Sequence, residues 1–202
     1  MMEREKQLQH IQQYVYDLFS NDTTGHDFFH LQRVALMAEM IAEKEGADSF
    51  LCRIAAWLHD VGDHKLFSRP QEALLEMESF LYNIHFTEAD VKQIILAIRD
   101  VSFSKGRTPH TIEGKIVQDA DRLDAIGAIG IARTFAYGGA KGQPIYDPIN
   151  PKQTSIDHFF TKLIHLKELL HTQAAIQLAN ERHLFLEHFL QQFFTEWYLK
   201  KP

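Results

Sequence analysis

One stretch decides the fold: residues 55–63, with the sequence Ala55-Ala-Trp-Leu-His-Asp-Val-Gly-Asp63. It is typical of the end of a buried helix, and it carries the adjacent pair His59 and Asp60. Burying an unpaired charge costs several kcal/mol, so this pair needs a partner. A divalent metal ion is a common partner for a neutral imidazole and a carboxylate together. The stretch therefore predicts a metal site, provided that other segments supply further ligands.

Helical periodicity extends to both sides of this stretch. Apolar residues at helical spacing predict helices over residues 3–20, 27–45, 49–60, 70–84, 87–99 and 111–124, and over 155–171 and 173–200. Gly46 is a helix stop, Pro70 suits a first helical turn, and Thr87 with Asp90 resembles a capping box. Residues 125–137, rich in Ala, Gly and Ile, continue the sixth helical stretch.

No alternating strand pattern is found, so the expected fold class is all-α. We expect a single-domain helical bundle over residues 1–202, with its motifs in about residues 20–137 and its C-terminal helices in 155–200. Residues 138–154 form the one long irregular segment, which is typical of a lid, a binding loop or an interface arm.

The composition narrows the class of partner. With 45% hydrophobic residues the 202-residue chain is globular, and its net charge of −6 argues against nonspecific binding to a nucleic acid duplex or an anionic membrane. The single cysteine permits no internal disulfide, and the charged N-terminus lacks an apolar secretory core. No apolar run approaches the roughly 20 residues that a membrane helix needs. The expected location is therefore the cytoplasm.

Two further segments offer metal ligands. In the first, His26, His30 and Arg33 are spaced to share one face of the helix over residues 27–45, although a solvent-facing helix start would also explain them. In the second, Asp121 adjoins the apolar stripe of the helix over residues 111–124. An ion pair with Arg122 or Arg133 is the alternative reading, and it suits Asp119 or Asp124 better than Asp121.

Side chains from three separate helices can thus converge on one ion: His30, His59, Asp60 and Asp121. A histidine at a helix C-terminus would be favourable by itself, but an acid there is not, so Asp60 needs the ion most. Mixed nitrogen and oxygen ligation without cysteine suits a catalytic ion rather than a structural zinc. Mn²⁺ is the first choice, and Mg²⁺, Fe²⁺, Co²⁺, Ni²⁺ and Zn²⁺ also fit. Four protein ligands leave open positions for water and substrate.

The series His30, His59-Asp60 and Asp121 resembles the HD-domain superfamily of metal-dependent phosphohydrolases. The resemblance covers roughly residues 20–150 and rests on the following strings: Gly25-His-Asp-Phe-Phe-His-Leu-Gln-Arg-Val34, Leu58-His-Asp-Val-Gly-Asp63, Asp119-Ala-Asp-Arg-Leu-Asp-Ala-Ile-Gly-Ala-Ile-Gly-Ile-Ala-Arg133, Tyr137-Gly-Gly and Pro144-Ile-Tyr-Asp-Pro148. They are similar to a small bacterial branch of stand-alone HD hydrolases, some of which act as nucleotide pyrophosphohydrolases. The resemblance implies a helical bundle around a metal held by the four residues named above.

The family also often carries an acid three residues after its His-Asp pair, a place that Asp63 fills here. The resemblance then implies catalytic roles for Asp60, as metal ligand, and for Asp63, which would orient a water or transfer a proton. The expected reaction is attack of metal-bound water on the phosphorus of a nucleotide or similar small phosphorylated molecule.

Asp60 and Asp121 formally cancel the charge of a divalent ion, so further cations are needed for the substrate phosphates. The candidates for that role are Arg33, Lys65, Lys105 and Arg122. A homodimer through the aromatic C-terminal helices and the 138–154 loop is also consistent with the sequence.

Two other functions share this scaffold. One is a nucleotide-sensing module without turnover, which would not need open metal positions. The other is a di-iron oxygenase, which needs two more histidines between Asp60 and Asp121; His64, His85 and His110 lie there but are typical of loops or helix edges. The bond that is cut and the roles of His26 and of the 138–154 loop stay open at this point.

Overall fold

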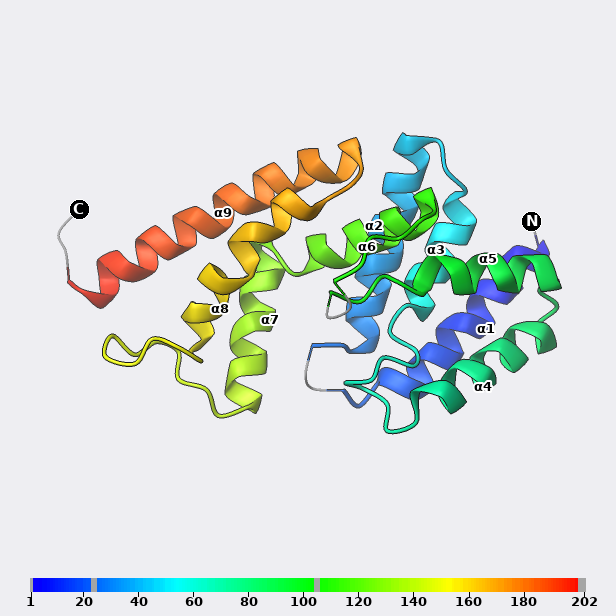
Figure 1. Ribbon diagram of the computed structural model, residues 1–202, viewed down its shortest axis with the longest axis horizontal. Helices are drawn as coiled ribbons and strands as arrows, with labels where there is room; N and C mark the ends of the chain where they lie inside the picture. Colours follow the sequence, from blue (N-terminus) through cyan, green and yellow to red (C-terminus); the bar gives the residue numbers. More distant parts are fainter. Residues whose placement is uncertain (1, 23–24, 104–105, 200–202) are drawn as a thin grey trace. The chain divides into compact units, whose positions relative to one another are not determined.

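The computed structural model describes residues 2–22, 25–103 and 106–199. Helices are the only regular secondary structure in these ranges, which confirms the all-α class. The elements are α1 (Met2–Phe19), α2 (Phe28–Glu45), α3 (Ser49–Leu58), α4 (Pro70–Asn83), α5 (Glu88–Ile98), α6 (Ile112–Asp124), α7 (Gly127–Ala140), α8 (Ser155–Thr161), the 3₁₀ helix η2 (Leu163–Leu169) and α9 (Gln173–Trp197), as Figure 1 shows. In the described ranges, no helix has both the length and the apolar character that crossing a membrane requires.

The chain divides into two compact units. The first comprises residues 1–22 and 26–121, and the second comprises residues 23–25 and 122–202. The expected ligands His30, His59, Asp60 and Asp121 all belong to the first unit. The expectation of a single domain over the whole chain stays a prediction.

Helix α3 is the centre of the first unit and packs against α1, α2 and α5 (Figure 1). Its side chains from Ile54 to Leu58 are all buried, as expected for a helix with neighbours on several sides. The Asp48 carboxylate caps its start by accepting a hydrogen bond from the backbone N–H of Leu51 (3.0 Å). This burial explains why the end of α3 delivers His59 and Asp60 into the interior.

The predicted capping signals of the first unit are confirmed. Gly46 ends α2 in the left-handed conformation, and Pro70 begins α4. Thr87 and Asp90 form the reciprocal hydrogen bonds of a capping box at the start of α5. These local devices fix where the helices begin and end, and hence which residues reach the site.

In the second unit, α7 and α8 pack together, and α9 packs against α7 and η2. The expected continuation of α6 is broken, because the chain turns at Ala125 and Ile126 and restarts with α7 at Gly127. Gly127 has φ +76°, and a Cβ there would lie 3.1 Å from Arg182 Cγ, so a larger residue would be strained. The small residues of this stretch thus serve a turn as well as close packing.

Two other boundaries differ from the sequence prediction. The helix expected over 155–171 is α8 followed by η2, whose 3₁₀ geometry places Leu163 and Leu166 on the same buried side. The irregular segment expected over 138–154 begins only after α7 ends at Ala140. Its Tyr146 packs against rings of α9 and lies 3.0 Å, hydroxyl to hydroxyl, from Tyr198. This contact anchors the segment on α9.

Candidate metal centre

The predicted ligands all lie at or next to helix ends. Asp27 caps α2 by accepting a hydrogen bond from the backbone N–H of His30 (2.7 Å), which fixes His30 in the first turn. His59 is the residue at which α3 ends, and Asp60 follows it in the turn. Asp121 lies in the last turn of α6. Three helices thus contribute to one cluster.

The four predicted ligands meet in the structure. His30 Nε2 lies 3.7 Å from Asp60 Oδ2 and 3.6 Å from Asp121 Oδ1. His59 Nε2 lies 3.4 Å from Asp60 Oδ1 and 3.8 Å from the same Asp121 oxygen. One donor atom each from His30, His59 and Asp121 lies within 4.8 Å of the other two, as a shared ion requires.

The cluster has a buried side and an accessible side. The side chains of His30, His59 and Asp60 are only 0%, 2% and 8% exposed, whereas that of Asp121 is 22% exposed. The three buried side chains are therefore shielded from bulk water, whereas the Asp121 carboxylate is partly accessible to it. A ligand from solvent can therefore approach from the Asp121 side.

The environment of His59 tests whether a cation fits. Its Nδ1 lies 2.7 Å from the carbonyl oxygen of Ala56, which can only accept, so Nδ1 carries the proton. Its Nε2 is buried and makes no hydrogen bond with any described residue, although two carboxylates face it. A lone pair facing carboxylate oxygens is unfavourable unless a proton or a metal ion lies between them. The donor set therefore fits a divalent cation.

The electrostatics of the pair agree with this reading. Burial lowers the pKa of His59, but the carboxylates of Asp60 and Asp121 outweigh it and raise this pKa above its usual value. Burial raises the pKa of Asp60, but His59 and His26 outweigh it and hold this pKa below its usual range. The cluster thus attracts positive charge.

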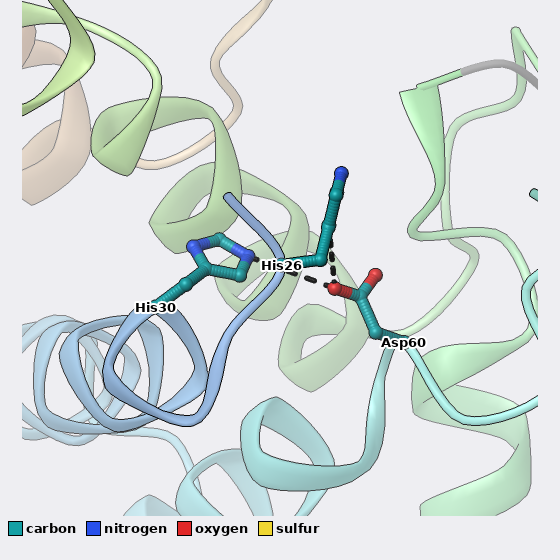
Figure 2. Close-up of side chains that lie close together, drawn as sticks. All are labelled: His26, His30 and Asp60. Atoms are coloured by element: carbon teal, nitrogen blue, oxygen red, sulfur yellow. Dashed lines mark hydrogen bonds and ion pairs between the residues drawn. The ribbon is translucent and has the colours of Figure 1, made fainter. Parts of the chain in front are cut away.

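His26 joins the cluster, a role that the sequence left open. Its Nδ1 lies 2.8 Å from Asp60 Oδ2, the same oxygen that His30 faces, and Figure 2 shows both rings directed at this carboxylate. The donor atoms of His26, His30 and Asp60 also lie within 4.8 Å of one another. His26 precedes the α2 cap Asp27, so the expected common helix face with His30 is wrong. The four-residue spacing between His26 and His30 was nevertheless the sequence feature that placed the two histidines near each other.

Asp63 has hydrogen-bond partners of its own. Its carboxylate accepts a hydrogen bond from the Ser102 hydroxyl (2.8 Å) and another from the backbone N–H of Lys65 (2.8 Å). The Asp63 backbone N–H donates to the Asp60 carbonyl oxygen (3.1 Å), which closes the turn after α3. Asp63 therefore ties the turn that carries Asp60 to the segment after α5. Its role in proton transfer stays a prediction.

The expected substrate cations have different surroundings. Arg33 is half-buried on α2, three residues after His30, and Lys65 is exposed in the turn after α3. Arg122 is buried, and its guanidinium donates to the carbonyl oxygen of Leu169 and contacts His171 in the second unit. Lys105 lies outside the described residues. Their contacts with a substrate stay predictions.

The histidines that a di-iron site would need are elsewhere. His64, His85 and His110 are all exposed, and none of them belongs to either group of converging donors in the described residues. The converging donors of the described residues thus do not include the histidines that a di-iron site would need. This arrangement does not favour the di-iron alternative.

Comparison with known proteins agrees with this geometry. The family model for the HD domain matches residues 28–126. YpgQ of Bacillus subtilis strain 168, an uncharacterized protein, is 40% identical over 195 residues, which cover 95% of this chain and 94% of YpgQ. The crystal structure of YpgQ in complex with ADP has a TM-score of 0.85 at 39% identity over 96% of both chains. A structure named as an HD-superfamily hydrolase, from Bacillus thuringiensis, has a TM-score of 0.80 at 43% identity, covering 96% of this chain and 98% of that one.

Proposed function

This chain belongs to the HD-domain family, and we propose that it is a metal-dependent phosphohydrolase that cleaves a phosphoester or phosphoanhydride bond of a nucleotide. The observation that carries the proposal is the buried Nε2 of His59, which faces two carboxylates and lacks a hydrogen bond among the described residues. Such an arrangement is suited to a cation and is costly without one.

In this proposal His30, His59, Asp60 and Asp121 hold the ion. Two nitrogen and two oxygen donors suit Mn²⁺ first, and also Mg²⁺, Fe²⁺, Co²⁺, Ni²⁺ or Zn²⁺. The bound ion would lower the pKa of a water ligand and offset charge on a phosphate oxygen. The hydrogen bond from His59 Nδ1 to the Ala56 carbonyl orients the ring, and His26 holds Asp60 in the same way.

Other side chains would bind the substrate phosphates and handle the proton of the attacking water. His26 (37% exposed) and Asp121 are the accessible members of the cluster, so the phosphate would enter from their side. Because the two carboxylates cancel the ion's charge, the substrate phosphates need Arg33 and Lys65, with Lys105 and Arg122 as the other predicted cations. Asp63 would orient a water or accept its proton.

A nucleotide is the proposed substrate class for two reasons. Some members of the small bacterial branch that the sequence resembles act as nucleotide pyrophosphohydrolases. YpgQ, which is similar over nearly the whole chain, has been crystallised in complex with ADP. Nothing in the described contacts favours one base or one phosphate position. The proposal is therefore a substrate class with a metal-dependent hydrolysis.

The test is release of phosphate and pyrophosphate by metal-free protein that has been supplied with one divalent ion at a time. Nucleoside mono-, di- and triphosphates form the substrate panel. We expect release that requires the ion and is lost in His59→Gln together with bound metal. His110→Gln is the matched control, because His110 is an exposed histidine outside both donor groups.

Three outcomes of this test are informative. Full metal content of His59→Gln by elemental analysis contradicts the ligand assignment. Nucleotide binding by the loaded protein without any product indicates the sensing module instead. Two irons per chain in protein purified without added metal would support the oxygenase.

A further inference from the structure

We propose that Arg133 is a positioning residue for the metal centre. Its guanidinium bonds two chain segments next to the cluster, one that follows Asp121 and one that precedes His26. This inference rests on the proposed function, since it assumes that the cluster binds an ion. Arg133 lies in the second unit, on α7, and belongs to neither group of converging donors in the described residues. Its contacts are what connect it to the ligands.

One terminal nitrogen of the guanidinium, Nη1, bonds the end of α6. Arg133 Nη1 donates to Asp124 Oδ2 (2.9 Å) and lies 3.4 Å from the Asp124 carbonyl oxygen. Asp124 is the last residue of α6, less than one turn after the ligand Asp121. The Asp124 side chain is 6% exposed and that of Arg133 is 20% exposed, so solvent screens this ion pair weakly.

The other terminal nitrogen, Nη2, bonds the segment that precedes α2. Arg133 Nη2 donates to the Gly25 carbonyl oxygen (2.6 Å), and Gly25, Asp124 and Arg133 all belong to the second unit. The next residue after Gly25 is His26, which bonds Asp60 and is followed by the α2 cap. The guanidinium therefore fixes the peptide group that precedes the first histidine of the cluster.

Gly25 is built for this contact. Its φ of +94° lies in the region that favours glycine, and a Cβ at this position would lie 3.4 Å from Arg133 Nε. The carbonyl that Arg133 bonds and the backbone turn into His26 thus depend on the same glycine. A substitution at either residue perturbs the entry to the cluster.

Arginine suits this place because its planar fork bonds two acceptors in fixed directions. Lysine would bring the charge to Asp124 without holding Gly25 in the same geometry. A purely structural ion pair is the competing explanation, and the chain contains a control for it. Arg182 also bonds the end of α6, through Nη1 to the Leu123 carbonyl oxygen (2.6 Å), and no described contact links it to Gly25.

The test compares Mn²⁺ binding to the full chain by calorimetry in wild type, Arg133→Met and Arg182→Met. Loss of a residue that orients metal ligands typically weakens metal affinity about 10- to 100-fold. We expect a loss of that order in Arg133→Met and a change within about 2-fold in Arg182→Met, since only Arg133 holds both segments. Urea unfolding with a chelator present reports the structural effect of each substitution separately.

Two further variants make the test independent of folding losses. Arg133→Lys keeps the charge, so it should fold, yet it should bind Mn²⁺ more weakly than wild type. Gly25→Ala should weaken binding as well, and its effect should not add to that of Arg133→Met if both act through one contact.

The results separate the two proposals. Wild-type affinity in natively folded Arg133→Lys or Arg133→Met overturns the positioning role, and so does an equal loss in Arg182→Met. If wild-type protein itself binds no divalent ion, the proposed function fails.

Discussion

Metal binding should stabilise the first unit selectively, and His59→Gln should abolish this stabilisation. The predicted donors His30, His59, Asp60 and Asp121 come from three segments that are far apart in the sequence, and all belong to the first unit, so only the folded unit brings them together. A ligand that binds the folded state alone raises its stability through mass action. The perturbation is therefore removal of one donor, compared with removal of the ion by a chelator.

The magnitude follows from linkage. At a free Mn²⁺ concentration of 100 times Kd, the stabilisation is about 2.7 kcal/mol. For a domain of this size, about 3 °C of Tm shift accompanies each kcal/mol, so chelation should lower the Tm of wild type by about 8 °C. His59→Gln should show almost no difference between metal-loaded and chelated samples, because its Nε2 donor is gone.

Tryptophan fluorescence can report this unit alone. The two tryptophans are Trp57, buried in α3 of the first unit, and Trp197, which ends α9 in the second. Trp197 is 42% exposed, so Trp197→Phe should fold and leaves Trp57 as the only tryptophan. Thermal unfolding of this variant, with and without Mn²⁺, then follows the metal-binding unit.

His110→Gln in the same background is the control and should keep the full metal-dependent shift. An unchanged shift in His59→Gln would refute the assignment of His59 as a ligand. No shift in the Trp197→Phe parent, under conditions in which calorimetry detects bound Mn²⁺, would refute the placement of the site in the first unit.

Three further outcomes can be stated together. Asp63→Asn should lower kcat by about 100-fold or more if Asp63 transfers a proton. Ser102→Ala, which removes a hydrogen-bond donor to Asp63, should change kcat by less than about 10-fold, and equal effects in steady-state kinetics would assign Asp63 a structural role. Tyr146→Ala should lower the free energy of unfolding in urea by about 1–3 kcal/mol, because the Tyr146 ring packs against aromatic rings of α9. Tyr146→Phe should keep most of that stability. A loss under roughly 0.5 kcal/mol in Tyr146→Ala, the lower limit for one ring pair, would mean that the 138–154 segment is not anchored on α9. Burial, together with the charges of Glu113 and Asp48, raises the pKa of Cys52 to about 12. At pH 8 only about one Cys52 thiol in ten thousand is then ionised, so Ellman's reagent should react with it only after denaturation. Rapid reaction of the folded protein would contradict the burial of Cys52.

Much of the fold was predictable because the signals are local. Capping residues and glycine stops act within a few positions, so Gly46, Pro70 and the Thr87 capping box marked their helix ends correctly. The break at Gly127 was missed because its small-residue pattern also fits a continuing helix, and its contact with Arg182 of α9 is distant in the sequence. The boundary between α8 and η2 was missed for a similar reason, since Leu163 and Leu166 fit a 3₁₀ face as well as an α-helical one.

The sequence indicated the four predicted ligands because Asp60 is costly at the end of a buried helix and because the other three complete a pattern that resembles the HD-domain superfamily. An acid at the end of a buried helix, as at Asp60, needs compensation wherever its partners come from. His26 carries no such cost. It is partly exposed and precedes its helix, so its hydrogen bond to Asp60 depends on the path of the backbone before the cap.

The backbone path before α2 also contains the Gly25 carbonyl that Arg133 bonds. The sequence offered Arg133 only as an ion-pair partner for an acid of α6, and that pair with Asp124 is present. It gave no sign of the Gly25 carbonyl, because an arginine can bond any carbonyl that the fold brings near. A residue with a single acceptor could be replaced by another cation at modest cost. Because Arg133 serves two acceptors, one before His26 and one after Asp121, the geometry of the proposed site depends on a side chain that binds neither ion nor substrate.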